Sequence, residues 1–196
     1  CETLSFFETN FASNCNFTEI DFGDTRIEFQ HIDCPNCRFL FQGSKFGKGN
    51  FGFYRSSFLN TDFFFEGCQF SCGGFTFHKT EIGNGNLNFV GTNFGNGPVK
   101  IDSSKFGTGE ITLNYCNISG SASFTELKEV NSLSRFSMKG ATFGRTLEIS
   151  ANEPFGCVID LTQTKLTNQV TLDGVRCSVS RKNWWQFFQK IEDSKE

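Results

Sequence analysis

The stretch from Phe51 to Asn86 reads FGFYRSSFLNTD, FFFEGCQFSCGG and FTFHKTEIGNGN, three consecutive blocks of twelve residues. In each block Phe occupies the first and third positions, and Phe or Ile occupies the eighth. Apolar residues two apart lie on one face of a β-strand, and nothing in the block recurs at helical spacing. The block therefore predicts a strand and a turn, followed by a second short strand.

The pattern continues on both sides of this stretch. The third position of successive blocks holds Phe6, Phe17, Phe29, Phe41, Phe53, Phe65, Phe77, Phe89, Ile101 and Leu113. After an interruption it returns in the sequence that follows Phe136. A repeated strand unit that cannot bury its own apolar face must stack on its neighbours, so the chain is expected to be a parallel β-solenoid.

One block is expected to form half of a coil, because twelve residues cannot enclose three side chains as large as Phe51, Phe53 and Phe58. Two blocks give about twenty-four residues and four short sides around a shared core. The fifth position supports this period, since it alternates between Gly and a larger residue: Gly43, Arg55, Gly67, Lys79, Gly91 and Ser103. A 24-residue coil places these glycines along one corner.

A small residue stands two positions before each central apolar residue. The set comprises Ser44, Ser56, Cys68, Thr80, Thr92, Ser104, Cys116, Ala141 and Thr164. With motifs such as Thr92-Asn93-Phe94-Gly95, the chain resembles the pentapeptide-repeat family over residues 4 to 178. The resemblance implies a right-handed quadrilateral β-helix with both residues pointing inward. The chain departs from that family in having steps of five and seven residues.

Two segments depart from the repeat. Residues 125 to 135 combine charged residues with Leu127, Val130 and Leu133, which predicts a short helical or loop insertion at the surface, with a partner-contacting loop as the alternative. The second segment is the C-terminal tail. The expected domains are a solenoid over residues 1–179 and an amphipathic capping or association helix over residues 180–196. Its apolar face is the candidate association surface: Trp184, Trp185, Phe187, Phe188 and Ile191.

The charge of the chain excludes several classes of partner. A net charge of −3 leaves no basic footprint for direct nucleic-acid binding. No apolar run reaches the roughly 20 residues of a membrane helix, so membrane insertion is not expected. The nine cysteines are irregularly spaced, which favours reduced thiols in a cytoplasmic protein. The alternative is a bacterial lipoprotein lipidated at Cys1.

No group of residues predicts catalysis or a bound cofactor. His31, Cys34 and Cys37 have a spacing compatible with metal, but Cys34 falls on a core position. A core thiol at Cys34, with His31 and Cys37 at the surface, is therefore expected in place of a metal site. Cys68 and Cys116 are expected to pack as small apolar residues. The carboxylates occupy different outward positions, and neither His31 nor His78 has a nucleophile at a matching position of the repeat. We therefore expect the chain not to be an enzyme.

The sequence favours a structural or protein-interaction module. Its partner is expected to be another protein or a second copy, held by the terminal helix or by an open coil end. The family resemblance also implies an alternative, a topoisomerase inhibitor that mimics DNA, although such mimicry needs a strongly acidic rod. A third hypothesis is a recognition or scaffolding domain of a larger bacterial defence or envelope protein.

Overall fold

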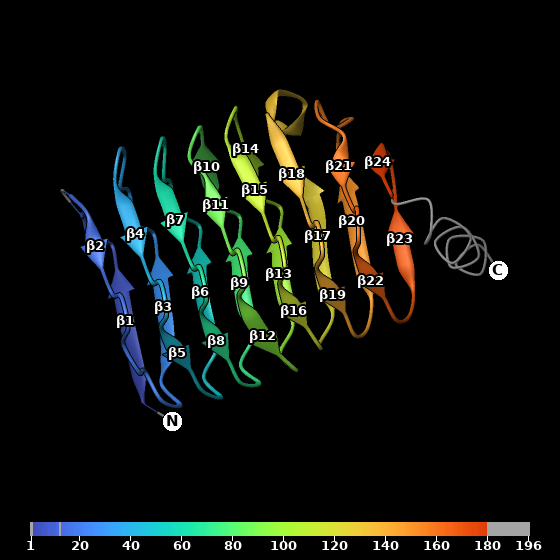
Figure 1. Ribbon diagram of the computed structural model, residues 1–196. Helices are drawn as coiled ribbons and strands as arrows, with labels where there is room; N and C mark the ends of the chain where they lie inside the picture. Colours follow the sequence, from blue (N-terminus) through green and yellow to red (C-terminus); the bar gives the residue numbers. More distant parts are fainter. Residues whose placement is uncertain (1, 12, 180–196) are drawn as a thin grey trace.

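The computed structural model describes residues 2–11 and 13–179. The chain folds as a parallel β-solenoid in which successive coils lie side by side along one axis (Figure 1). The coil has about twenty-four residues, because Phe51 pairs with Ile27 on one side and with Phe75 on the other. The predicted all-β parallel solenoid and its coil length are confirmed. The right-handed sense of the coil stays a prediction.

Two eight-stranded parallel sheets form the longer sides of each coil. Sheet A consists of β1 (Thr3–Phe7), β3 (Arg26–Gln30), β6 (Phe51–Tyr54), β9 (Phe75–His78), β13 (Val99–Asp102), β17 (Ala122–Leu127), β20 (Leu147–Ala151) and β23 (Val170–Leu172). Sheet B consists of β2 (Cys15–Asn16), β4 (Arg38–Leu40), β7 (Asp62–Phe64), β11 (Leu87–Asn88), β15 (Glu110–Thr112), β18 (Arg135–Ser137), β21 (Ile159–Asp160) and β24 (Cys177–Ser178). The two sheets carry the Phe-x-Phe pairs of alternate blocks.

The eighth position of the block lies on two shorter sides. Sheet C consists of β5 (Lys45–Phe46), β8 (Gln69–Phe70), β12 (Asn93–Gly95), β16 (Asn117–Ile118), β19 (Thr142–Phe143) and β22 (Lys165–Leu166). Sheet D consists of β10 (Glu81–Gly83) and β14 (Lys105–Phe106), extended by single bridges such as Ser57 to Glu81. The chain passes from A to D, then to B and C, so each coil has the four sides that the repeat predicts.

Phenylalanine rings stack coil over coil inside the tube. The rings of Phe29, Phe53 and Phe77 are nearly parallel, with centroids 4.6 and 4.7 Å apart, close to the spacing of paired strands. A second stack joins Phe41 and Phe65 at 4.7 Å. Edge-to-face contacts cross between the stacks, and every one of these five rings is fully buried. Aromatic rings therefore fill the core where aliphatic side chains would ordinarily lie.

The small inward residues bind neighbouring coils together through hydrogen bonds. Ser44 Oγ donates to the Phe17 carbonyl at 2.6 Å and accepts from the Ile20 N–H at 3.0 Å. Cys68 and Cys116 occupy the same position, and their Sγ atoms donate to main-chain carbonyls at 2.9 and 2.8 Å. The expectation that these two thiols are merely apolar packing groups was therefore incomplete.

The segment predicted as a surface insertion is part of the solenoid wall. β17 runs through Leu127, and a 3-10 helix follows at Val130–Ser132. Leu127, Val130 and Leu133 are buried and supply apolar side chains where the repeat is interrupted. The short helical element predicted here is confirmed by the 3-10 helix, whereas its placement as an insertion at the surface was wrong, because the apolar residues of this segment point into the core. The amphipathic helix predicted for residues 180–196 lies outside the described residues.

Candidate functional site

Each coil turns sharply where sheet A ends, and this corner presents a column of side chains. Its members have backbones in the left-handed region, with φ between 48° and 54°: Glu8, His31, Arg55, Lys79, Ser103 and Glu126. The corner has this conformation in six successive coils, so the six side chains repeat at the strand spacing of about 4.8 Å. We call the exposed central residues His31, Arg55 and Lys79 the basic ridge.

Two hollows that are open to solvent flank the basic ridge. The hollow over sheet A measures about 350 Å³ and is lined by residues that include Arg26, Glu28, Tyr54 and His78. The hollow on the sheet D side measures about 440 Å³ and is lined by residues that include Asp33, Ser57 and Glu81. His31 and Arg55 line both. The ridge therefore stands between two depressions, and an occupant of either one meets Arg55 and His31.

Polar residues of β3 and β6 form the floor of the first hollow, where Glu28 is buried and Gln30 and Tyr54 are half-buried. The Glu28 carboxylate accepts from Arg26 Nε at 2.7 Å and from Gln30 Nε2 at 3.0 Å. The Tyr54 side chain folds back over Gly52, where an added Cβ would lie 2.6 Å from the Tyr54 Oη. Burial, reinforced by the negative charge of Glu28, raises the pKa of the Tyr54 hydroxyl. The charges of Arg26 and Glu28 therefore balance each other in the floor of this hollow.

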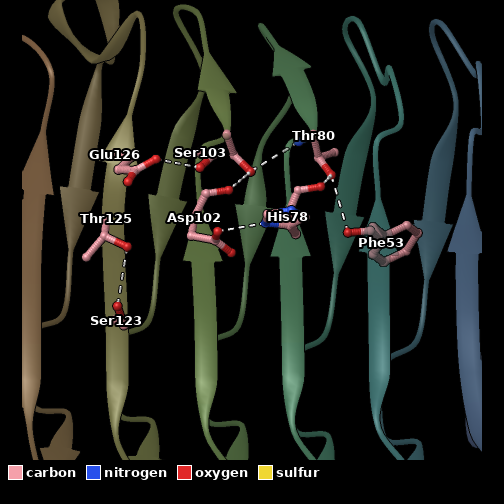
Figure 2. A network of polar contacts seen from close by, with 9 residues as sticks. Phe53, His78, Thr80, Asp102, Ser103, Ser123, Thr125 and Glu126 are labelled. Carbon is pink, nitrogen blue, oxygen red and sulfur yellow. Dashed lines mark hydrogen bonds and ion pairs between the residues drawn. The ribbon is translucent and has the colours of Figure 1, made fainter.

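A histidine and a carboxylate meet across neighbouring strands at the edge of this hollow. Figure 2 shows Asp102 on β13 pointing toward His78 on β9, and the His78 Nδ1 to Asp102 Oδ2 distance is 2.7 Å. The parallel register of β9 with β13 pairs His78 directly with Asp102. Among the described residues, no hydroxyl or thiol lies within hydrogen-bond distance of the His78 ring. The pair fixes the imidazole without offering it a nucleophile to activate.

The two cations at the centre of the ridge have no ion-pair partner among the described residues. Ser103 Oγ donates to the Glu126 carboxylate at 2.8 Å, and on the adjoining side Lys105 Nζ contacts Glu81 at 3.2 Å and Glu129 at 2.8 Å. Within residues 2–11 and 13–179, no carboxylate lies within ion-pair distance of Arg55 or Lys79. These two cations are therefore available to an external anion.

The first coil is a second candidate site, because its strands are paired on one side only. In the described part of the chain, β1 pairs with β3 and β2 pairs with β4, and no other strand pairs with either. Phe6, Phe11 and Phe17 are half-buried, and the side chain of Leu4 is 38% exposed. One coil further on, Phe29 and Phe41 are fully buried. Among the described residues, this edge thus has backbone groups without a strand partner beside apolar side chains.

The cysteines do not form a metal centre. Cys34 and Cys37 form a disulfide with Cα atoms 6.1 Å apart, and the side chain of Cys37 is also buried. Cys34 lies in the core as predicted, but the expectations of reduced thiols throughout and of Cys37 at the surface were wrong. No group of three metal-ligating side chains occurs in the described residues.

The free buried thiols are protonated at neutral pH. Burial raises the pKa of both Cys68 and Cys116 to about 12. Because the thiolate is the nucleophilic form, neither side chain is suited to covalent chemistry at neutral pH.

The residues predicted as a site from the sequence are not those that form the candidate site in the structure. The candidate association surface of Trp184, Trp185, Phe187, Phe188 and Ile191 lies outside the described residues. Sequence reasoning missed the His78–Asp102 pair and the basic ridge. The sequence contained the signal for both features. A period of 24 residues places His78 beside Asp102 in the next coil. The same period aligns residues 31, 55 and 79 in three successive coils.

Comparisons with known proteins give little further information. No protein-family model matches the chain, and no curated protein matches it. Two trypsin-treated variants of QnrB1, a plasmid-mediated fluoroquinolone resistance protein, align over 94% and 95% of this chain and 96% of their own, with 14% identity and TM-scores of 0.26 and 0.27. Full-length QnrB1 aligns over 94% of this chain and 98% of its own, with 12% identity and a TM-score of 0.22.

The described chain contains no helix of the length and apolar character needed to cross a membrane.

Proposed function

We propose that this chain is a non-catalytic structural and protein-interaction module, a pentapeptide-repeat-like solenoid with longer sides, whose first coil accepts a strand from a second copy. The open edge of β1 and β2 carries the proposal. A row of unpaired backbone groups beside apolar side chains is a template for strand addition. A second copy fits this edge because the same row on both partners is self-complementary about a two-fold axis.

The direction of the free backbone groups follows from the next coil. Arg26, which pairs in register with Thr3, donates its N–H to the Glu2 carbonyl of the coil before it at 2.9 Å. Strand alternation therefore directs the N–H groups of Thr3, Ser5 and Phe7 off the open edge of sheet A. These donors are the ones that an added strand would use.

Substitution of Ser5 by proline tests the proposal. The Ser5→Pro change removes one outward donor and leaves the bonds between β1 and β3 in place, so we expect self-association to weaken about tenfold, the equivalent of about one hydrogen bond. Light scattering after size exclusion, over a concentration series from about 1 to 100 μM, measures the change. The matched control is Ser5→Ala, which changes the same side chain and keeps the outward N–H, so its self-association should equal that of the wild type.

Two outcomes would contradict the edge as the association site. Wild-type protein that stays monomeric over the whole series removes the second copy as partner. Equal association of wild type, Ser5→Ala and Ser5→Pro places the contact elsewhere.

Two features of the site favour this role over the alternatives considered. The His78–Asp102 pair lies in an open hollow and lacks a nucleophile among the described residues, which supports binding over catalysis. DNA mimicry needs a continuous acidic face, whereas the corner of sheet A carries Arg55 and Lys79 without counter-charges. The pentapeptide-like arrangement is supported by burial of the small inward residues, such as Ser44, Thr92 and Ser104.

A further inference from the structure

The basic ridge has a defined length and is bounded by acids. The corner column reads Glu8, His31, Arg55, Lys79, Ser103 and Glu126 in successive coils. At about 4.8 Å per coil, His31 and Lys79 lie about 10 Å apart along the axis. Glu8 precedes this stretch, and Glu126 follows it beyond Ser103. A long polyanion laid along the column would therefore meet a carboxylate at either end, whereas a short anion would not.

Most of the carboxylates beside the ridge already contact other side chains. Glu28 is held by Arg26 and Gln30, and Glu81 is held by Lys105. Asp102 is held by His78. Asp33 is the exposed acid that remains beside the ridge. Arg55 and Lys79 are therefore cations without an ion-pair partner among the described residues, although the whole chain has a net charge of −3.

The shape of the site favours an extended polymer over a compact small molecule. Small-molecule sites enclose most of the surface of their ligand. Here two open hollows run on either side of a raised row of side chains, so that an occupant is covered on one face only. An extended peptide with carboxylates at alternate positions places them about 6.6 Å apart on one side, which fits within the 10 Å length of the ridge.

We propose that the basic ridge binds a short acidic segment of a partner protein in extended conformation, with two carboxylates at alternate positions contacting Arg55 and Lys79. The inference rests on the proposed role as a protein-interaction module and specifies the chemistry of the partner. His31 and Gln30 line the hollow next to Arg55 and are placed to donate to the peptide backbone or to a further acid.

Peptide binding tests the proposal directly. The probes are a blocked, fluorescein-labelled hexapeptide with two glutamates at alternate positions among glycines, and its glutamine counterpart. Fluorescence anisotropy should show binding of the glutamate peptide at least tenfold tighter than that of the glutamine peptide. The affinity should fall as the salt concentration rises, because both partners are exposed charges.

Charge reversal on the ridge should abolish this preference. Arg55→Glu is expected to weaken binding of the glutamate peptide at least tenfold, and Lys79→Glu provides a second variant. Glutamate already occupies this left-handed corner position at Glu8 and Glu126, so the fold can accept both changes. The matched control is Arg145→Glu, since Arg145 is an exposed arginine away from the ridge, and its effect should stay within twofold.

Several outcomes would overturn the ridge proposal. They are equal binding of the two peptides, equal weakening by Arg145→Glu, absence of peptide binding at millimolar concentration, and tighter binding of a six-nucleotide thymidine oligomer or a sulfated disaccharide. The Ser5→Pro variant separates this proposal from the edge proposal. It should bind the glutamate peptide as the wild type does, and loss of that binding would mean that the peptide occupies the open edge.

Discussion

Replacing Phe53 by alanine is expected to lower the free energy of unfolding by about 3 to 5 kcal/mol. Phe53 is fully buried, and its ring stacks between Phe29 and Phe77 at centroid distances of 4.6 and 4.7 Å. Edge-to-face contacts with Phe58 and Phe63 surround the same ring. Truncation leaves a cavity that its neighbours cannot fill, because each of them is fixed by the coil above and the coil below.

Urea unfolding followed by circular dichroism measures this loss, with Leu59→Ala as the control. The side chain of Leu59 is 43% exposed, so its truncation should cost less than about 1 kcal/mol. Equal losses for the two variants would mean that Phe53 does not lie in a continuous core.

Replacing Gly85 by alanine is expected to cost about 3 kcal/mol or more, or to prevent folding. A Cβ at this position would lie 1.8 Å from the Thr61 carbonyl oxygen and 2.6 Å from its carbonyl carbon, in the coil before it. Both atoms belong to the backbone, so neither can rotate away, and the coils would have to separate locally. Forced overpacking of this kind costs more than a change of side-chain conformation.

Gly67→Ala is the matched control, because its Cβ would meet no heavy atom within 4 Å. Gly67 has a φ of 65°, so alanine there carries only the left-handed backbone cost of about 1 kcal/mol. Urea unfolding should therefore rank Gly85→Ala as the more damaging change. The reverse ranking would show that the coils are not in close backbone contact at Gly85.

The sequence predicts the core and the corners well, because both follow from the period alone. Phe53 and Phe77 stand 24 residues apart, and side chains alternate along a strand, so each had to stack on the other inside the tube. The corners at Gly43 and Arg55 differ in residue size but share a positive φ, which the alternating fifth position indicated for the glycines. Because the coils stack in register, residues that stand 24 apart in the sequence lie next to each other in neighbouring coils.

The features that the sequence did not predict depend on local backbone conformation. The disulfide between Cys34 and Cys37 requires the turn through Asn36, whose φ is 62°, to bring both Sγ atoms inward. Similarly, the charged residues near Leu127 suggested a surface loop, whereas the strand continues and buries its apolar side chains. The turn at Asn36 recurs one coil later at Asn60, whose φ is 57°, but the pair of cysteines beside it does not recur, so the period alone could not predict the disulfide.

The polar surface could be predicted only in part from the sequence. The pair formed by His78 and Asp102 follows from the period once the fourth position is examined, since the two residues stand in adjacent coils. Whether a cation in the corner column has an ion-pair partner depends on whether the nearby carboxylates already have other partners. The Glu126 carboxylate, for example, accepts a hydrogen bond from Ser103. The ridge thus became visible only when the partners of the surrounding carboxylates were known.

Disulfide formation between engineered cysteines tests the coil length most directly. Lys45 pairs with Gln69 in sheet C, while Ser57, twelve residues from Lys45, lies on sheet D. In a Cys72→Ser background, which removes an exposed thiol, the pair Lys45→Cys with Gln69→Cys should cross-link under mild oxidation, because paired strands bring Cα atoms within disulfide range. The pair Lys45→Cys with Ser57→Cys should stay reduced in peptide mapping by mass spectrometry. A cross-link in the second pair and none in the first would contradict a solenoid of twenty-four residues per coil.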